Sequence, residues 1–404
     1  MGMTETCSHD VAGRVPLTSA PFPWSNLLAL AMAGFITILT EALPAGLLPQ
    51  IGASLRVSEA LAGQIVTLYA IGSLAAAIPL TSATRGMRRR PLLLLAISGF
   101  AVTNTATALS DSYGLTLVAR FLAGVSAGLL WALIAGYAAR MAPKGSKGRA
   151  IAVAMIGTPL ALSLGIPAGT YLGAVIGWRA SFGVMSGLTL ILIAWVTMKV
   201  PDFPGQTEDE RLPLGHVFAL PGIRPVLFVT LTFVLAHNIL YTYIAPLLGS
   251  AGGATRTDLA LLVFGIAALA GIWIVGVLID RHLRSLTLIS IASFGLAALA
   301  LGIAGHAPII TLSATGLWGL AFGGVATLFQ TALAKAAGDM HDLAQSMLVT
   351  AWNAAIAGGG IIGGVLLDHF GAGAFAPVAL LLLAAAFIAA HRACRHGFPI
   401  SFAP

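Results

Sequence analysis

The chain has 404 residues, of which 58% are hydrophobic and only 9% are Asp, Glu, Lys or Arg, and its mean hydropathy is +0.94. A soluble domain carries roughly a quarter charged residues, so this composition cannot cover a water-facing surface and excludes a soluble globular protein. The formal net charge is +7, but the cations form short clusters between apolar runs. This arrangement argues against nucleic acid as a partner.

The polar ends of the chain hold no residues that indicate a disulfide framework, a metal site or a cleaved signal peptide. Both cysteines, Cys7 and Cys394, lie there, so we expect neither a disulfide framework nor a metal site. The segment from Met1 to Asn26 lacks the short apolar core and cleavage site of a signal peptide, which predicts that the first apolar run stays in the mature protein. The apolar runs hold no paired carboxylates and no phosphate-binding loop, so we expect neither an enzyme nor a cofactor.

Apolar runs of about 20 residues, long enough to cross a ~30 Å hydrocarbon core as helices, recur along the chain. They predict twelve spans: 25–48, 60–83, 91–110, 114–138, 149–174, 180–200, 224–248, 259–279, 286–304, 308–333, 346–367 and 374–391. The fold class expected is therefore an all-α membrane protein. Its predicted parts are a tail (1–24), a six-helix bundle (25–200), a linker (201–223), a second six-helix bundle (224–391) and a tail (392–404).

Lysine and arginine are distributed unevenly among the predicted loops. If residue 1 lies in the cytosol, all but four of the 21 cations fall in inward segments. The outward segments hold Arg56, Arg179 and Arg256, and Arg120 lies within a span. This asymmetry follows the positive-inside rule. It predicts a multi-pass protein of a bacterial inner membrane with both termini in the cytosol.

The two sets of six spans repeat each other. The second span of each set runs into a basic cluster, Arg85 to Arg90 and then Asp280 to Arg284. Small residues recur every four positions in the fifth spans, at Gly157, Ala161, Gly165, Gly169 and Gly173, and at Gly360 and Gly364. Such faces let helices approach closely in lipid. Two repeated halves are typical of transporters that bind solute near the bilayer midplane.

Several motifs stand in order on these spans: Thr40-Glu-Ala-Leu-Pro-Ala-Gly-Leu-Leu-Pro49, Arg120-Phe-Leu-Ala-Gly124, Gly165-Ile-Pro167-Ala-Gly169, and His237-Asn-Ile-Leu-Tyr-Thr-Tyr-Ile-Ala-Pro246. Together they resemble the major facilitator superfamily, within its twelve-span drug:proton antiporter group, near the bacterial sugar and purine-nucleoside efflux permeases. The resemblance implies a monomer that exports a small organic solute (a sugar, nucleoside or amphipathic drug) by proton antiport with alternating access. A uniporter or a proton-coupled importer of a nutrient is the alternative.

The chain departs from the family pattern in the loop after the second span. Pro79 replaces a glycine of the family motif and Ala83 replaces its aspartate, while the basic run Arg88, Arg89 and Arg90 is retained. An aspartate stands at the matching place only in the second half, at Asp280, followed by Arg281. The resemblance predicts that these five charged residues form gating loops.

Glu41 is the one acidic residue that falls within a predicted span. An ionised group in hydrocarbon is costly, so such a group is usually paired or functional. Arg120 is expected on the order of 10 Å below the same surface, which makes direct pairing or a shared site possible. We predict that the two residues couple transport to protons, against the alternatives of a permanent structural ion pair and a solvated glutamate at a helix end.

His237 is expected near the bilayer centre, one helical turn from Tyr241, and within one residue of Glu41's position in the repeat. Histidine titrates near physiological pH, so His237 is either a second proton site or a ligand contact, or else a packing residue. We also expect Tyr241, Tyr243, Gln330 and Asn353 to contact substrate. Gln330 and Asn353 have the alternative of linking helices.

Overall fold

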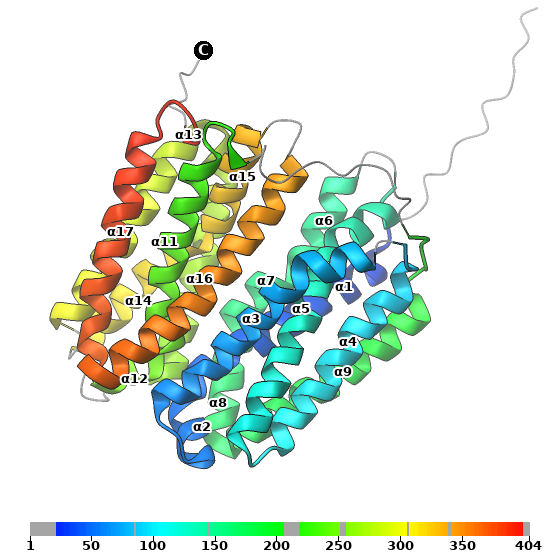
Figure 1. The fold of residues 1–404 in the computed structure, drawn as a ribbon, viewed down its shortest axis with the longest axis horizontal. Helices are drawn as coiled ribbons and strands as arrows, with labels where there is room; N and C mark the ends of the chain where they lie inside the picture. The colour runs from blue at the N-terminus through cyan, green and yellow to red at the C-terminus, as the bar shows by residue number, and fades with distance from the viewer. Residues whose placement is uncertain are drawn as a thin grey trace, which may run out of the picture.

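The structure is a computed structural model that describes residues 22–84, 86–143, 146–205, 218–250, 256–304, 307–337 and 341–398. The ordered elements of this part of the chain are helices, and they form two bundles that stand side by side (Figure 1). The first bundle runs from blue to green, and the second from green to red.

The N-terminal bundle comprises the elements up to residue 199. They are α1 (Trp24–Ala42), the 3-10 turn η1 (Leu43–Leu47), α2 (Leu48–Leu55), α3 (Glu59–Ala83), α4 (Arg89–Leu109), α5 (Tyr113–Met141), α6 (Lys147–Met155), α7 (Gly157–Leu160), the π-helical turn η2 (Ala161–Gly165), α8 (Ile166–Ile176) and α9 (Trp178–Lys199).

The C-terminal bundle repeats this order. It contains α11 (Ile223–Thr242), α12 (Ile244–Ser250), α13 (Thr257–Ala304), α14 (Pro308–Gly323), α15 (Val325–Ala337), α16 (His341–Phe370), the 3-10 turn η4 (Ala372–Ala374) and α17 (Phe375–Arg392).

Eleven stretches of the described chain are helical, long and apolar enough to cross a membrane. One of them, α13, has 48 residues and a non-helical conformation at His282 (φ −129°, ψ 26°). A helix of that length is about 72 Å long, twice what one crossing requires, so α13 crosses twice and the total is twelve. The predicted break between spans 8 and 9 therefore lies at His282, where the two helical parts of α13 meet at a kink.

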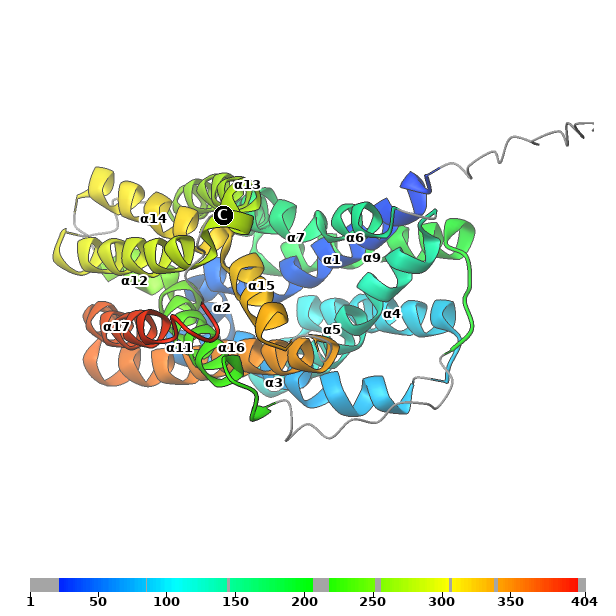
Figure 2. The same cartoon turned by 90° about the horizontal axis from the view of Figure 1, so that it is seen from above.

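The chain alternates between two ends of the molecule. We call the end that carries α2, α8 and α12 the α2 end, and the opposite end, near Phe22 and Phe398, the terminal end (Figures 1 and 2). Across the two bundles, α3 packs on α16, α8 and η2 pack on α13, and α2 packs on α12. Arg56, Arg179 and Arg256 lie at the α2 end, whereas the basic residues around α4, α11 and α17 lie at the terminal end.

The small-residue face of the fifth span packs against α1 and η1. A Cβ at Gly157 would collide with the carbonyl of Ala31, and one at Gly169 would lie 2.8 Å from the side chain of Leu43. Gly165 meets Phe35 in the same way, at 2.8 Å. These glycines therefore hold α1 tightly within its bundle, which fixes the helix that bears Glu41.

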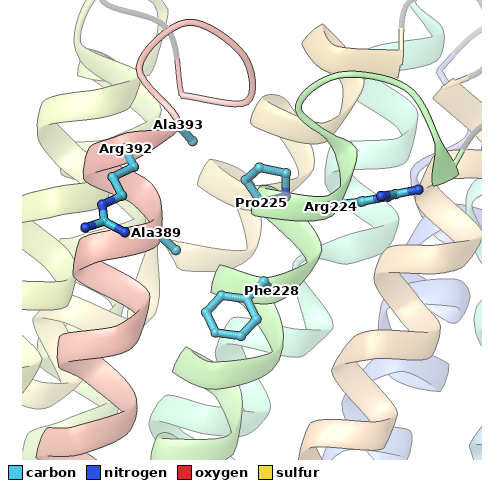
Figure 3. Close-up of a pocket in the computed structure, with 6 residues that line it drawn as sticks. All are labelled: Arg224, Pro225, Phe228, Ala389, Arg392 and Ala393. Atoms are coloured by element: carbon cyan, nitrogen blue, oxygen red, sulfur yellow. The ribbon is translucent and has the colours of Figure 1, made fainter.

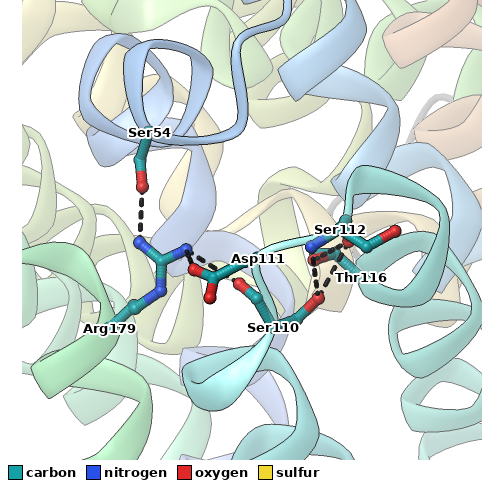
Figure 4. A network of polar contacts seen from close by, with 6 residues as sticks. All are labelled: Ser54, Ser110, Asp111, Ser112, Thr116 and Arg179. Carbon is teal, nitrogen blue, oxygen red and sulfur yellow. Dashed lines mark hydrogen bonds and ion pairs between the residues drawn. The ribbon is translucent and has the colours of Figure 1, made fainter.

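Hydrogen bonds connect the ends of neighbouring helices within each bundle. At the α2 end, Arg179 donates to Ser54, to the Ser110 carbonyl (2.8 Å) and to Asp111 (2.8 Å), which joins three helix ends (Figure 4). At the terminal end of the other bundle, Arg284 donates to the carbonyl oxygens of Ala390 (3.0 Å) and Phe398 (3.2 Å).

Candidate functional site

Glu41 lies in the last turn of α1, beside the point where that helix breaks. Pro44 opens η1, and a proline has no N–H to donate to the carbonyl four residues before it. That carbonyl belongs to Thr40 and is left free for another donor. The Glu41 side chain is half-buried, and it forms no hydrogen bond or ion pair with any described residue.

Arg120 supplies the donor that Thr40 needs. Its side chain is fully buried, and its Nη2 donates to the Thr40 carbonyl at 2.5 Å, while Nε donates to the Ile65 carbonyl at 3.5 Å. The guanidinium also lies over the rings of Tyr69 (4.9 Å) and Phe182 (5.7 Å). Carbonyl oxygens and aromatic ring faces thus stabilise the buried positive charge of Arg120, as cation–π contacts do in desolvated sites.

Glu41 and Arg120 interact electrostatically without forming an ion pair. Each lies within range of the other's charge, but in the described part of the chain no carboxylate is within ion-pair distance of Arg120. The Nη1 atom of Arg120 is buried and has no acceptor. The direct pair between Glu41 and Arg120 is therefore not formed in this arrangement, although Arg120 contacts the residue next to Glu41.

A second layer of polar groups holds this part of the N-terminal bundle. Asn104 donates to the Thr40 hydroxyl at 3.0 Å, and Tyr69 donates to the Thr37 carbonyl at 3.1 Å. These bonds position the last turn of α1 directly before Glu41. Sequence reasoning missed Asn104 and Tyr69, although a buried amide in an apolar span was visible as a signal.

Tyr241 approaches Glu41 from the C-terminal bundle. The Glu41 carboxyl group is near enough to act electrostatically on the Tyr241 hydroxyl. The hydroxyl oxygen is buried and has no hydrogen-bond partner among the described residues. A carboxyl group from one bundle and an unsatisfied phenol from the other therefore face the same region.

His237 is enclosed by aromatic rings of its own bundle. It is 5% exposed, stacks on Phe322 (3.7 Å between centroids) and on Tyr241 (5.0 Å), and accepts a hydrogen bond at Nδ1 from Trp318 Nε1 (3.1 Å). The indole nitrogen can only donate, so Nδ1 carries no proton. Protonation of His237 would break this bond, so the geometry favours a neutral ring that shapes the site over a second proton site.

The other residues predicted to bind substrate lie in different settings. Tyr243 is fully buried where α11 ends, and Figure 1 places that end of α11 at the α2 end of the molecule. Gln330 is exposed on α15. Asn353 is half-buried on α16 and donates to the Val349 carbonyl of its own helix (3.0 Å), not to a neighbouring helix.

The predicted gating residues lie near the ends of helices. Asp280 and Arg281 are exposed residues directly before His282, where the two helical parts of α13 meet at a kink. Arg88 forms an ion pair with Asp202 (2.6 Å), and Asp202 also accepts from the Arg90 backbone N–H (3.0 Å). The aspartate absent at Ala83 is thus replaced by one from the end of the same bundle. The Asp202 carboxyl has a lowered pKa, because the Arg90 N–H and then the Arg88 charge stabilise its ionised form.

Two cavities lie away from this site. One of about 390 Å³ lies between α11 and α17, where Phe228 forms one wall and Arg224 and Arg392 point away from each other (Figure 3). The second, of about 330 Å³, lies between the bundles at the α2 end. Neither cavity is lined by Glu41 or His237. The candidate site is therefore neither of these two cavities, and it is defined by side chains that the two bundles contribute.

Two bundles of apolar helices that repeat the same order of elements, with helices long enough to cross a membrane, are typical of a multi-pass membrane transport protein. The family model described as "Major Facilitator Superfamily" matches residues 30–359. The chain belongs to the Major Facilitator Superfamily, the family of secondary transporters of small solutes. The predicted all-α membrane fold is confirmed.

Several known proteins are similar to the chain. A Pseudomonas aeruginosa protein named transcription regulatory protein OpdE is 29% identical over 392 residues, covering 94% of this chain and 96% of that one. A D-xylose–proton symporter has a TM-score of 0.76 at 16% identity, covering 93% and 98%. A bacterial homologue of the human lysosomal transporter Spinster, inward-facing and unoccupied, has a TM-score of 0.66 at 14% identity, covering 94% and 97%. The two solved structures show the fold alone.

Proposed function

We propose that the protein exports a small organic solute by proton antiport, as the drug:proton antiporter group does. The observation that carries this proposal is the half-buried carboxyl group of Glu41, which directly follows the Thr40 carbonyl held by Arg120 and lies within electrostatic range of Tyr241 of the other bundle. A protonatable group at the boundary of two moving bodies can bind its proton differently in each conformation. Differential binding is what couples a proton gradient to a conformational change.

The state of Arg120 supports this role for Glu41. In the arrangement observed, Arg120 holds the Thr40 carbonyl and keeps Nη1 without an acceptor. A deprotonated Glu41 can pair with Nη1, whereas a protonated Glu41 has no charge with which to do so. Proton binding therefore switches one buried interaction on or off, beside the contact between the bundles.

The chemistry of the site favours a solute that combines a ring with hydrogen-bonding groups. Phe322, which stacks on His237, and Trp352 are half-buried, with ring centroids 6.2 Å apart, and can stack on a planar or sugar ring. Tyr241 and Glu41 offer a hydroxyl and a carboxyl group. Sugars, nucleosides and amphipathic drugs share these features.

We further propose that the protein lies in a bacterial cytoplasmic membrane with its terminal end inside, as the cation asymmetry predicts. The bundles then pack together on the outer side. The described packing between bundles involves α2, α8 and α12, which supports an arrangement closed to the outside.

Reconstituted vesicles test this function. Purified protein in liposomes, supplied with a panel of labelled sugars, nucleosides and cationic drugs, should move a solute against an imposed pH gradient and in the opposite direction to the protons. Transport with the protons supports the alternative, a proton-coupled importer. Transport whose rate and direction do not depend on the pH gradient supports a uniporter.

A further inference from the structure

Gln64 and Tyr243 connect the two bundles at the α2 end. Gln64 Nε2, on α3, lies 3.2 Å from the Tyr243 hydroxyl and 3.2 Å from the Gly360 carbonyl, both in the C-terminal bundle. The Tyr243 hydroxyl in turn lies 2.7 Å from the Gly360 carbonyl and 3.2 Å from the Ala60 carbonyl of α3. Gln64 thus donates across the bundle boundary, and the single proton of the Tyr243 hydroxyl can be donated either to Gly360 of its own bundle or to Ala60 of the other.

Glycines form a slot for the Tyr243 ring. A Cβ at Gly63 of α3 would collide with the ring, and one at Gly363 of α16 would lie 2.7 Å from it. A Cβ at Gly364 would lie 2.7 Å from the hydroxyl oxygen and 2.8 Å from Gln64 Nε2. The slot therefore has walls from both bundles, and it exists only while α3 and α16 are in contact.

The position of Tyr243 follows from the local sequence. The helix α11 ends at Thr242, and Tyr243 adopts φ −109° and ψ 32°, which separates it from α12 and from the helical face that carries His237. The side chain is fully buried between α3 and α16 in this arrangement.

We propose that Gln64, Tyr243 and the glycines around them form a latch that holds the α2 end of the protein closed. Alternating access, which is part of the proposed function, requires α3 and α16 to separate at this end. Separation breaks the bonds between Gln64 and the C-terminal bundle and the bond from Tyr243 to Ala60. The latch thereby sets the population of the state that is open at the α2 end.

Distances between the bundles test the latch without knowledge of the solute. In a background with Cys7 and Cys394 replaced by serine, spin labels are placed at Ala53 of α2 and Gly373 of η4, which are exposed at the α2 end. We expect Tyr243→Phe and Gln64→Leu each to enlarge the population with separated labels by about three- to tenfold, the effect of losing one ordinary hydrogen bond. Gly364→Ala should act in the same direction by blocking the slot.

Matched controls separate the latch from general damage. Tyr113→Phe removes a hydroxyl that donates to the Leu61 carbonyl within the N-terminal bundle (2.8 Å), and Gly187→Ala adds a methyl group where nothing lies within 4 Å. Both should leave the label distances unchanged. Unchanged distances in Tyr243→Phe and Gln64→Leu, or equal changes in the controls, would overturn the proposal. Because these distances need no pH gradient, a failed latch is distinguishable from a failed proton antiport.

Discussion

Arg120 donates a 2.5 Å hydrogen bond to the carbonyl oxygen of Thr40, the oxygen that Pro44 leaves without a helical donor. The cation therefore holds a helix break in place, and Glu41 is the next residue after that carbonyl. A change at either residue alters both the shape of α1 and the charge beside the bundle boundary.

The first prediction concerns the proton. Glu41→Gln resembles the protonated form and cannot release its proton, so it should insert normally and bind solute, yet fail to pump it against an imposed pH gradient. Solute binding should also lose most of its pH dependence. Flux in liposomes and binding at several pH values measure this, with Glu59→Gln, at the first turn of α3, as the carboxylate control. Normal pumping by Glu41→Gln would remove Glu41 as the coupling residue.

The second prediction concerns stability. Arg120→Gln leaves the Thr40 carbonyl without its charged donor, and a lost hydrogen bond to a charged group costs about 1.5–3 kcal/mol. We expect a lower thermal unfolding midpoint in detergent together with impaired transport. Arg179→Gln, at a half-buried site at the α2 end of the same bundle, should lower the midpoint less than replacement of the fully buried Arg120 does. The opposite ranking of the two variants would contradict the role assigned to Arg120.

The third prediction separates binding from coupling at His237. Trp318→Phe removes the donor to Nδ1, and His237→Gln removes the ring that stacks on Phe322. Both should weaken solute binding several-fold while the pH dependence of transport persists, because the ring stays neutral throughout. Affinity and the pH profile of flux are measured on the same preparations. Loss of pH dependence in His237→Gln would make His237 a proton site.

The fourth prediction concerns Asp202, whose pKa is lowered from 3.8 by the Arg90 N–H and the Arg88 charge. A carboxyl group with a lowered folded pKa stabilises the fold above its unfolded pKa, and this contribution is lost as the pH falls through the folded value. Asp202→Asn should therefore unfold at a lower temperature than the parent chain at about pH 7. The difference should vanish at pH values well below 3.8. A difference that persists in acid would mean that the ion pair is not its cause.

The fifth prediction concerns orientation. Ser112 lies at the α2 end and Ser146 at the terminal end. Single cysteines at these positions should react with an impermeant thiol reagent from opposite sides of the membrane, Ser112→Cys from outside. Labelling of both from the same side would contradict the topology inferred from the cations.

Hydropathy and charge were sufficient to predict the spans, because each crossing needs about 20 apolar residues. The helical rise also predicted that Glu41 and Arg120 lie near each other, and Arg120 indeed contacts the Thr40 carbonyl beside Glu41. Pro44 could have identified the Thr40 carbonyl as the acceptor for Arg120, since the missing N–H is visible in the sequence. The partner of Arg88 could not be found in this way, because Asp202 is distant in sequence and meets it only through packing.

Two features of the local backbone could not be predicted from the sequence either. The cluster Asp280 to Arg284 has the polarity of a loop, yet the backbone stays helical on both sides of His282. Tyr243 shares a short motif with His237, but the end of α11 at Thr242 turns it toward the other bundle. In both cases the composition indicates the polarity of the segment, but the backbone conformation at one residue, His282 or Tyr243, decides the local geometry.

The ion pair and hydrogen bonds at the terminal end affect how the two bundles can move. Arg88 with Asp202 joins parts of the N-terminal bundle only, and Arg284 joins α13 to the chain end at Phe398 within the C-terminal bundle. Each half can therefore rotate as a rigid body, with its own end contacts intact, when the halves approach or part there. The contacts that such a rotation must rearrange lie between the bundles, where α3 meets α16, α8 and η2 meet α13, and α2 meets α12. Substitutions along these contacts should change the turnover rate more than substitutions elsewhere on the surface.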